Sequence, residues 1–106
     1  TQAGPDEVAE QTINCFRECV PSDVRGIVFL SGGQTSIEAT DHLNRMNSMG
    51  PHPWELSFSY GRALQHDPLM TWNGSNENRT IAQETFLKRA KLNGLARYGN
   101  YNTDME

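Results

Sequence analysis

The sequence has little that would support binding to nucleic acid, a membrane or a metal ion. Its 106 residues include nine lysines and arginines against thirteen acids, so the net charge is −4 and there is no basic stripe of the kind nucleic-acid binders carry. No apolar run approaches the roughly 20 residues of a membrane span, and residues 1–20 contain no apolar segment typical of a signal peptide. The three histidines are dispersed and do not share metal-ligand spacing. We therefore expect no nucleic acid, no membrane, and no metal or other cofactor.

Cysteine is also scarce. Cys15 and Cys19 lie four residues apart in a helical stretch, so they share one face, and no histidine follows them at ligand spacing. We interpret them as buried free thiols. Free thiols are typical of a reducing compartment, and we expect a cytoplasmic protein.

The length allows one domain and excludes a complete (β/α)8 barrel, which needs roughly 250 residues. Apolar residues make up 36% of the chain, and the mean hydropathy is −0.66. Both values are low for a chain that must cover both faces of a parallel sheet by itself, because a short domain buries a smaller share of its surface than a large one.

The hydrophobic pattern predicts alternating helices and strands. Helical spacing of apolar residues, turn residues and short apolar runs place the elements as follows: a helix over 5–19, a strand over 26–30, a helix over 35–48, a strand over 54–59, a short helix over 60–66 closed by Asp67-Pro68, and a long helix over 77–98. Thr35 and Glu38 form a capping-box pattern at the start of the second helix. Strands linked through helices predict a parallel sheet, but two such strands alone do not make a stable one.

The last third of the chain contains both lysines of the sequence and a polar C-terminal segment. The cluster Lys88-Arg89-Ala90-Lys91 holds the only two lysines, and we interpret it as a solvated helix face. A lysine that forms a Schiff base needs a desolvated pocket or a neighbouring cation that lowers its pKa, and neither Lys88 nor Lys91 is expected to have one. The polar end, 100–106, is predicted to be frayed.

The residues with the clearest chemical potential follow the two predicted strands. Ser31-Gly32-Gly33 follows the first strand and leads into a helix, whose free N–H groups can bind an anion. Ser59-Tyr60-Gly61-Arg62 follows the second strand and adds a guanidinium, which can bind phosphate through two parallel hydrogen bonds. Ligands bind at the carboxyl ends of strands in α/β folds, so the two loops together predict a phosphate site. Tyr60 itself is interpreted as a packed aromatic residue.

Longer motifs around these loops resemble class I fructose-1,6-bisphosphate aldolase. They are Gly26-Ile-Val-Phe-Leu-Ser-Gly-Gly-Gln34, Leu43-Asn-Arg-Met-Asn47 and Pro53-Trp-Glu-Leu-Ser-Phe-Ser-Tyr-Gly-Arg-Ala-Leu-Gln65. Shorter matches continue at Trp72-Asn-Gly74, Ala82-Gln-Glu84 and Lys88-Arg-Ala90, so the similarity runs from about residue 8 to 101.

The resemblance implies an α/β fold in which residues 1–106 are the C-terminal portion of a TIM-barrel domain, with strands seven and eight of the barrel. It implies a glycolytic and gluconeogenic enzyme that reversibly cleaves fructose 1,6-bisphosphate into glyceraldehyde 3-phosphate and dihydroxyacetone phosphate through a lysine Schiff base, without metal. A sugar-phosphate substrate, the remainder of the aldolase chain and a homotetramer are the implied partners. Carried over by motif, the substrate-phosphate-binding residues would be Leu30 through its backbone, Ser31, Gly32, Gly33, Ser59, Gly61 and Arg62.

The resemblance also implies that the Schiff-base lysine and the acid/base carboxylates lie upstream of this segment. We therefore expect a fragment of a longer enzyme that carries binding residues and no catalytic ones. A stand-alone phosphate-binding or protein-interaction module is the alternative. A third interpretation, an ABC transporter ATPase, rests on the string Leu30-Ser-Gly-Gly-Gln34 but lacks the P-loop that it requires.

Overall fold

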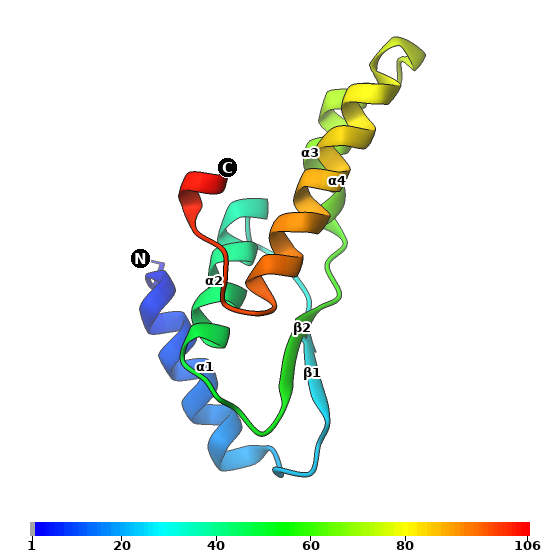
Figure 1. Cartoon of the computed structure of the whole chain (residues 1–106). Helices are drawn as coiled ribbons and strands as arrows, with labels where there is room; N and C mark the ends of the chain where they lie inside the picture. The colour runs from blue at the N-terminus through cyan, green and yellow to red at the C-terminus, as the bar shows by residue number, and fades with distance from the viewer. Residues whose placement is uncertain (1) are drawn as a thin grey trace.

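The computed structural model describes residues 2–106 and has a helix-rich α/β architecture with two parallel strands (Figure 1). The elements follow one another as α1 (Pro5–Cys19), β1 (Gly26–Phe29), α2 (Ser36–Ser48), β2 (Glu55–Phe58), α3 (Arg62–Trp72), the 3-10 turn η1 (Asn76–Asn78), α4 (Arg79–Ala96) and the 3-10 turn η2 (Thr103–Met105). The predicted order of elements is confirmed, and most boundaries agree within one or two residues.

Local sequence signals explain where the first two helices begin and end. Pro5 occupies the first turn of α1, where its missing N–H costs nothing, and the helix ends shortly before Pro21. The side chain of Thr35 caps α2 by accepting a hydrogen bond from the Glu38 amide at 3.1 Å. The predicted Thr35 cap is therefore confirmed. The return contact of the capping box is not seen among the described residues, where the Glu38 carboxylate instead accepts from Gln2 Nε2 at 3.3 Å.

The two strands pair in parallel with a register that runs from Gly26 opposite Glu55 to Phe29 opposite Phe58. The pairing continues one step further, because the Ser59 amide donates to the Phe29 carbonyl at 2.8 Å. Side chains alternate across β1, and Val28, on the side away from the core, keeps 62% of its surface exposed. Among the described residues neither strand has a second neighbour, so both outer edges are open.

One main core joins the first two helices, β2 and α4. Its buried members are Ala9, Ile13, Leu43, Met46, Trp54, Leu56, Leu92, Ala96 and Tyr101. In Figure 1, α1 and α2 lie along one side of the strands, and α3 and α4 form a hairpin that projects away from them. None of the helices within residues 2–106 has the length and apolar character to cross a membrane.

The prediction that Asp67-Pro68 closes the third helix is wrong. The helix continues through Pro68 to Trp72 and ends at Asn73, whose φ of 50° is the left-handed conformation common at helix ends. Proline has no N–H, so one hydrogen bond of the helix is lost at this point. Pro68 is buried and lines the groove between α3 and α4, and we attribute the persistence of the helix to the packing of α3 against α4.

The prediction of a frayed C-terminal segment is also wrong. Tyr101 is only 4% exposed, its amide donates to Asn44 Oδ1 at 3.0 Å, and its hydroxyl donates to Glu106 Oε2 at 2.8 Å. Polar composition predicted fraying because the sequence does not reveal these partners, one of which is 57 residues away in the chain.

The interpretation of the cysteines as buried is likewise corrected. Cys15 and Cys19 are both free and both exposed on α1. They share a helix face because they are four residues apart on α1. The charge of the nearby Cys15 thiol raises the pKa of Cys19. The buried face of α1 instead carries Ala9 and Ile13.

We predict that Ile13→Ala lowers the free energy of unfolding of the protein that contains this chain by about 2–5 kcal/mol, because it leaves a cavity where α1 packs on the core. Ile13 is fully buried. Asn14→Ala, at the exposed neighbouring position, is the matched control and should change stability by less than about 0.5 kcal/mol. Urea denaturation measures both, and equal effects would contradict the described core.

Candidate functional site

The two loops singled out from the sequence lie side by side at one edge of the sheet. The parallel register places Phe29 and Phe58 together, so the residues that follow them leave the sheet at the same end. The first loop leads into α2 and the second into α3. The predicted juxtaposition of the loops is therefore present in the structure.

The first loop is a tight turn that ends at a helix N-terminus. The Gln34 amide donates to the Ser31 carbonyl at 3.0 Å, and Gly33 has a φ of +80°, which residues with a side chain rarely adopt. Within residues 2–106 the amides of Ser36 and Ile37, in the first turn of α2, have no hydrogen-bond acceptor. Free amides at a helix N-terminus attract anions.

The second loop supplies a positive charge. Arg62 is the first residue of α3, is exposed, and makes no ion pair with any described residue. The preceding Gly61 is also exposed, and no atom lies within 4 Å of the place where a Cβ would be. The guanidinium is thus available to a ligand.

Ser31 joins the two loops. It is 4% exposed, and its Oγ accepts a hydrogen bond from the Ala63 amide, in the first turn of α3, at 3.3 Å. The buried hydroxyl therefore fixes the start of α3 relative to the first loop. In the structure, then, Ser31 has a structural contact in addition to the binding role that the resemblance implies.

A cleft of about 530 Å³ opens between the start of α2 and α3. It is lined by Gly33, Gln34, Thr35, Ser36, Ile37, Arg62, His66 and Asp67. Gly33 and Arg62 belong to the predicted site, and the structure brings them to the same cleft. His66 and Asp67 were missed. His66 follows Arg62 by four residues, so helical spacing could have placed it on the same face, whereas no such signal indicates Asp67.

The other predicted site residues lie beside this cleft or away from it. Gly32, Ser59 and Gly61 are exposed on the two loops without lining the cleft. Leu30 is 76% exposed and contributes instead to a separate cavity of about 130 Å³. The predicted set therefore marks the strand ends correctly, but only part of it surrounds one cavity.

Tyr60, in the second loop, is a packed residue as predicted. It is 7% exposed, and its hydroxyl donates to the Ala39 carbonyl at 2.9 Å. Burial raises the pKa of its phenol well above the ordinary range. The phenol therefore stays protonated at neutral pH and holds the second loop against α2.

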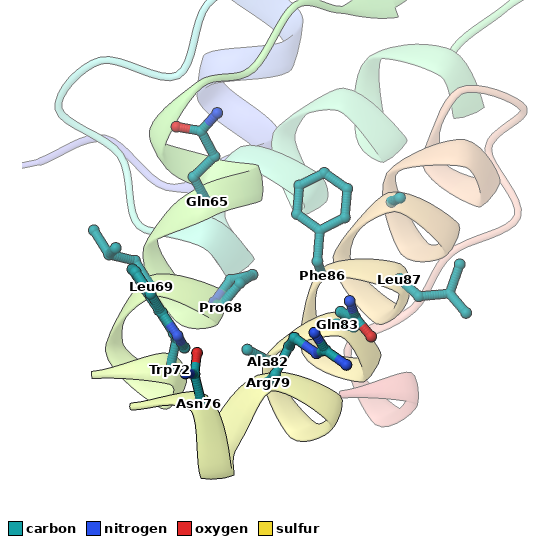
Figure 2. Close-up of a pocket in the computed structure, with 11 residues that line it drawn as sticks. Gln65, Pro68, Leu69, Trp72, Asn76, Arg79, Ala82, Gln83, Phe86 and Leu87 are labelled. Carbon is teal, nitrogen blue, oxygen red and sulfur yellow. The ribbon is translucent and has the colours of Figure 1, made fainter. Parts of the chain in front are cut away.

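A larger groove of about 750 Å³ lies between α3 and α4, on the projecting hairpin (Figure 2). Its walls are mainly apolar, and Leu69, Trp72, Phe86 and Leu87 are exposed there. Arg79, the first residue of α4, also lines this groove, but it lies among mainly apolar side chains. The smaller cleft has more polar walls and is the better candidate for binding a small anion. Residues 2–106 contain no group of three or more metal-binding side chains.

Comparison with known proteins identifies relatives over the whole chain. The family model "Fructose-bisphosphate aldolase class-I" matches residues 1–106. A chloroplastic fructose-bisphosphate aldolase of Oryza sativa subsp. japonica is 50% identical over 105 residues, covering 99% of this chain and 27% of the relative. An aldolase of Plasmodium falciparum is 52% identical over 95 residues, covering 90% of this chain and 26% of the relative. The chain thus spans little more than a quarter of the length of these relatives.

A solved structure agrees with the sequence comparison. Fructose-bisphosphate aldolase from Plasmodium falciparum, determined in complex with TRAP and a small-molecule inhibitor, superposes with a TM-score of 0.92 at 48% sequence identity. The superposition covers 96% of this chain and 29% of that structure. At this identity the likeness extends to the sequence as well as the fold.

We predict that Ser31→Ala lowers the free energy of unfolding by about 1–3 kcal/mol, because it leaves the Ala63 amide buried without an acceptor. Ser59→Ala, at the equivalent strand end but exposed, should change stability by less than about 0.5 kcal/mol. Thermal and urea unfolding of both variants check the difference. Equal stability of the two variants would show that the Ser31 contact does not hold the loops together.

Proposed function

The chain belongs to the class I fructose-bisphosphate aldolase family, and we propose that it is part of an enzyme that reversibly cleaves fructose 1,6-bisphosphate into glyceraldehyde 3-phosphate and dihydroxyacetone phosphate. Within that enzyme, we propose that the cleft between α2 and α3 binds a phosphate group of the substrate. The observation that carries the second proposal is the convergence of the free amides of α2 and the unpaired Arg62 on one cleft.

This arrangement suits a phosphate dianion for two physical reasons. The N-terminus of α2 carries the positive end of the helix dipole, so the Ser36 and Ile37 amides stabilise negative charge. Arg62 can donate two parallel hydrogen bonds to phosphate oxygens from the opposite wall. Together they bind a doubly charged group without a metal ion.

We further propose that β1 and β2 are strands seven and eight of a TIM barrel whose other strands lie in the remainder of the enzyme. Both outer edges of the pair are open within the described residues, and Val28 is exposed beside them. Neighbouring strands would pair with these edges, and closure of the barrel would cover the exposed face that carries Val28. Family membership also favours a homotetramer. The cytoplasmic location stays a prediction.

Carbon–carbon cleavage in this proposal proceeds through a Schiff base on a lysine outside this chain. Lys88 and Lys91 both lie on the exposed surface of α4, and neither lines the cleft. A lysine becomes a good nucleophile when a desolvated pocket favours its neutral amine, and an exposed helix surface does not provide such a pocket. The segment therefore contributes binding residues to the reaction.

We predict that Arg62→Ala in the aldolase that contains this chain weakens binding of fructose 1,6-bisphosphate by about 1.5–3 kcal/mol, the range for a hydrogen bond to a charged group. This corresponds to an affinity roughly 10–150-fold lower. Arg79→Ala, which removes an exposed arginine outside the cleft, is the matched control and should bind normally. Unchanged affinity in Arg62→Ala would refute the phosphate assignment.

A second prediction concerns the lysines. Borohydride reduction in the presence of substrate should leave Lys88 and Lys91 unmodified and label a lysine elsewhere in the enzyme, as peptide mass spectrometry would reveal. Label on either residue would overturn the assigned division between binding and catalysis. Phosphate binding with no cleavage of the bisphosphate by the whole protein would favour the alternative, a binding module without catalysis.

A further inference from the structure

Arg89 is buried, although the sequence places it in a cluster interpreted as a solvated helix face. It is 1% exposed, whereas its neighbours Lys88 and Lys91 are exposed, so that interpretation is wrong for this one residue. Arginine is almost never fully buried unless its charge is paired and hydrogen-bonded. The contacts of its guanidinium therefore need an explanation.

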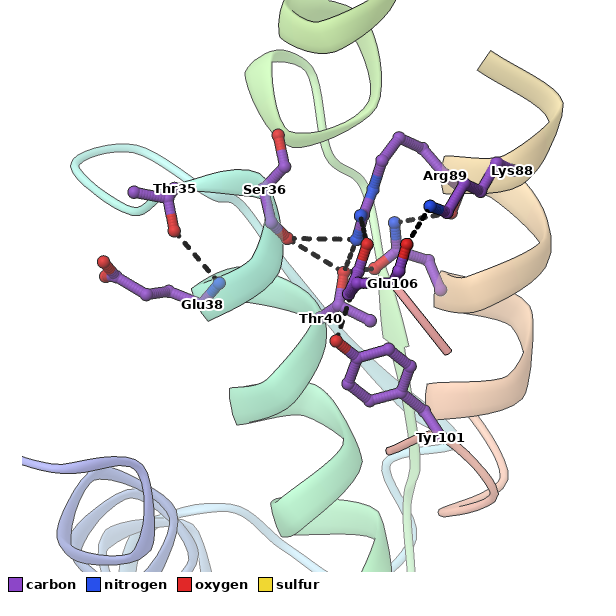
Figure 3. Close-up of polar contacts among 9 residues, drawn as sticks. Thr35, Ser36, Glu38, Thr40, Lys88, Arg89, Tyr101 and Glu106 are labelled. Atoms are coloured by element: carbon purple, nitrogen blue, oxygen red, sulfur yellow. Dashed lines mark hydrogen bonds and ion pairs between the residues drawn. The ribbon is translucent and has the colours of Figure 1, made fainter. Parts of the chain in front are cut away.

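The guanidinium of Arg89 crosses from α4 to the start of α2 (Figure 3). Nη2 donates to Thr40 Oγ1 at 2.6 Å and to the Ser36 carbonyl at 3.3 Å. Nη1 pairs with Glu106 Oε1 at 2.5 Å. The third nitrogen, Nε, is buried without a partner among the described residues, so the two Nη groups make all the side-chain contacts.

Asn93, also on α4, adds a second polar contact between α4 and α2. Asn93 is fully buried; its Nδ2 donates to the Arg89 carbonyl at 2.9 Å, and its Oδ1 lies 2.9 Å from Thr40 Oγ1. The Thr40 hydroxyl also lies 2.9 Å from the Ser36 carbonyl. The hydroxyl has one hydrogen, so it donates either to that carbonyl or to Asn93 Oδ1. Thr40 therefore connects both α4 residues to the first turn of α2.

This first turn of α2 is also one wall of the candidate phosphate cleft. Ser36 lines the cleft, and its amide is one of the free donors described above, while its carbonyl accepts from Arg89. Arg89 does not line the cleft. The same residue, Ser36, thus lines the cleft with a free amide and is held by α4 through its carbonyl.

We propose that Arg89 is a positioning residue for the phosphate site: through Ser36 and Thr40 it fixes the orientation of the amides at the N-terminus of α2. This inference rests on the proposed function of the cleft. Placement of these donors matters because hydrogen-bond strength falls steeply when distance and angle depart from the ideal. Glu106 neutralises the charge of Arg89, so its effect on the cleft is through position and not through net charge.

The test uses Arg89→Lys in the full-length enzyme, because lysine keeps the charge but cannot reach Ser36 and Thr40 with a planar fork. We expect KM for fructose 1,6-bisphosphate and the inhibition constant of inorganic phosphate to rise about tenfold, the equivalent of one hydrogen bond to a charged group. The value of kcat should change less than about threefold, since Arg89 does not touch the reacting atoms. Unchanged constants, or a loss confined to kcat, would overturn the proposal.

A matched pair at Thr40 keeps the proposal testable if Arg89→Lys fails to fold. Thr40→Val removes the hydroxyl that accepts from Arg89 and should raise both constants in the same direction. Thr40→Ser keeps the hydroxyl and should restore them to within about twofold, the scatter expected when no interaction is lost. Equal constants in the two variants would overturn the proposal.

Two further variants distinguish an effect of position from an effect of net charge, and the positioning role of Arg89 from the assignment of the cleft. Glu106→Gln keeps an acceptor for Arg89 but removes the neutralising charge, and it should leave phosphate affinity unchanged; a tighter-binding variant would show that net charge acts instead of position. Arg62→Ala tests the cleft itself. If Arg62→Ala weakens phosphate binding and Arg89→Lys does not, only the positioning role fails; if neither does, the proposed function fails with it.

Discussion

The parallel pairing of β1 with β2 is the constraint on which the candidate site depends. Because Phe29 lies opposite Phe58, the loops that follow both strands emerge at one end of the sheet. Two motifs about thirty residues apart thereby contribute Gly33 and Arg62 to one cleft. An antiparallel pair would send the loops to opposite ends of the sheet. A shift of one residue in register would turn every side chain of a strand to the other face. The buried Ser31 hydroxyl and the Tyr60 hydroxyl then hold the emerging segments together.

Local signals allowed the elements and the two loops to be predicted from the sequence. A continuous apolar run predicts β1, the Thr35 cap predicts the start of α2, and Pro5 and Pro21 bound α1. Such signals act within a few residues, so composition and spacing are sufficient to read them. The glycines and Arg62 after the strands are local signals of the same kind, and the structure places Gly33 and Arg62 at one cleft, whose binding of an anion stays a prediction. The two strand-end motifs are also specific enough in residue type and separation to indicate the family.

Features that depend on long-range contacts could not be predicted in this way. Arg89 reads as a surface cation because its partners, Thr40 and Ser36, are about fifty residues distant. Tyr101 reads as part of a frayed end because Asn44 is equally remote. Pro68 reads as a helix end because proline disfavours a helix interior. In the structure the packing of α3 against α4 outweighs this local preference. In each case tertiary contacts override the local signal.

These long-range contacts change how the final helix should be understood. The motifs place all candidate binding residues between Leu30 and Arg62, which would leave α4 as a covering element. Yet a buried guanidinium is costly unless it is fully paired, and apolar residues of similar volume often serve stability as well or better. Arg89 forms a planar fork between the first turn of α2 and the terminal segment, a geometry that an apolar side chain cannot provide. The proposed positioning of the α2 N-terminus at the candidate phosphate cleft would account for a charged residue at this buried position.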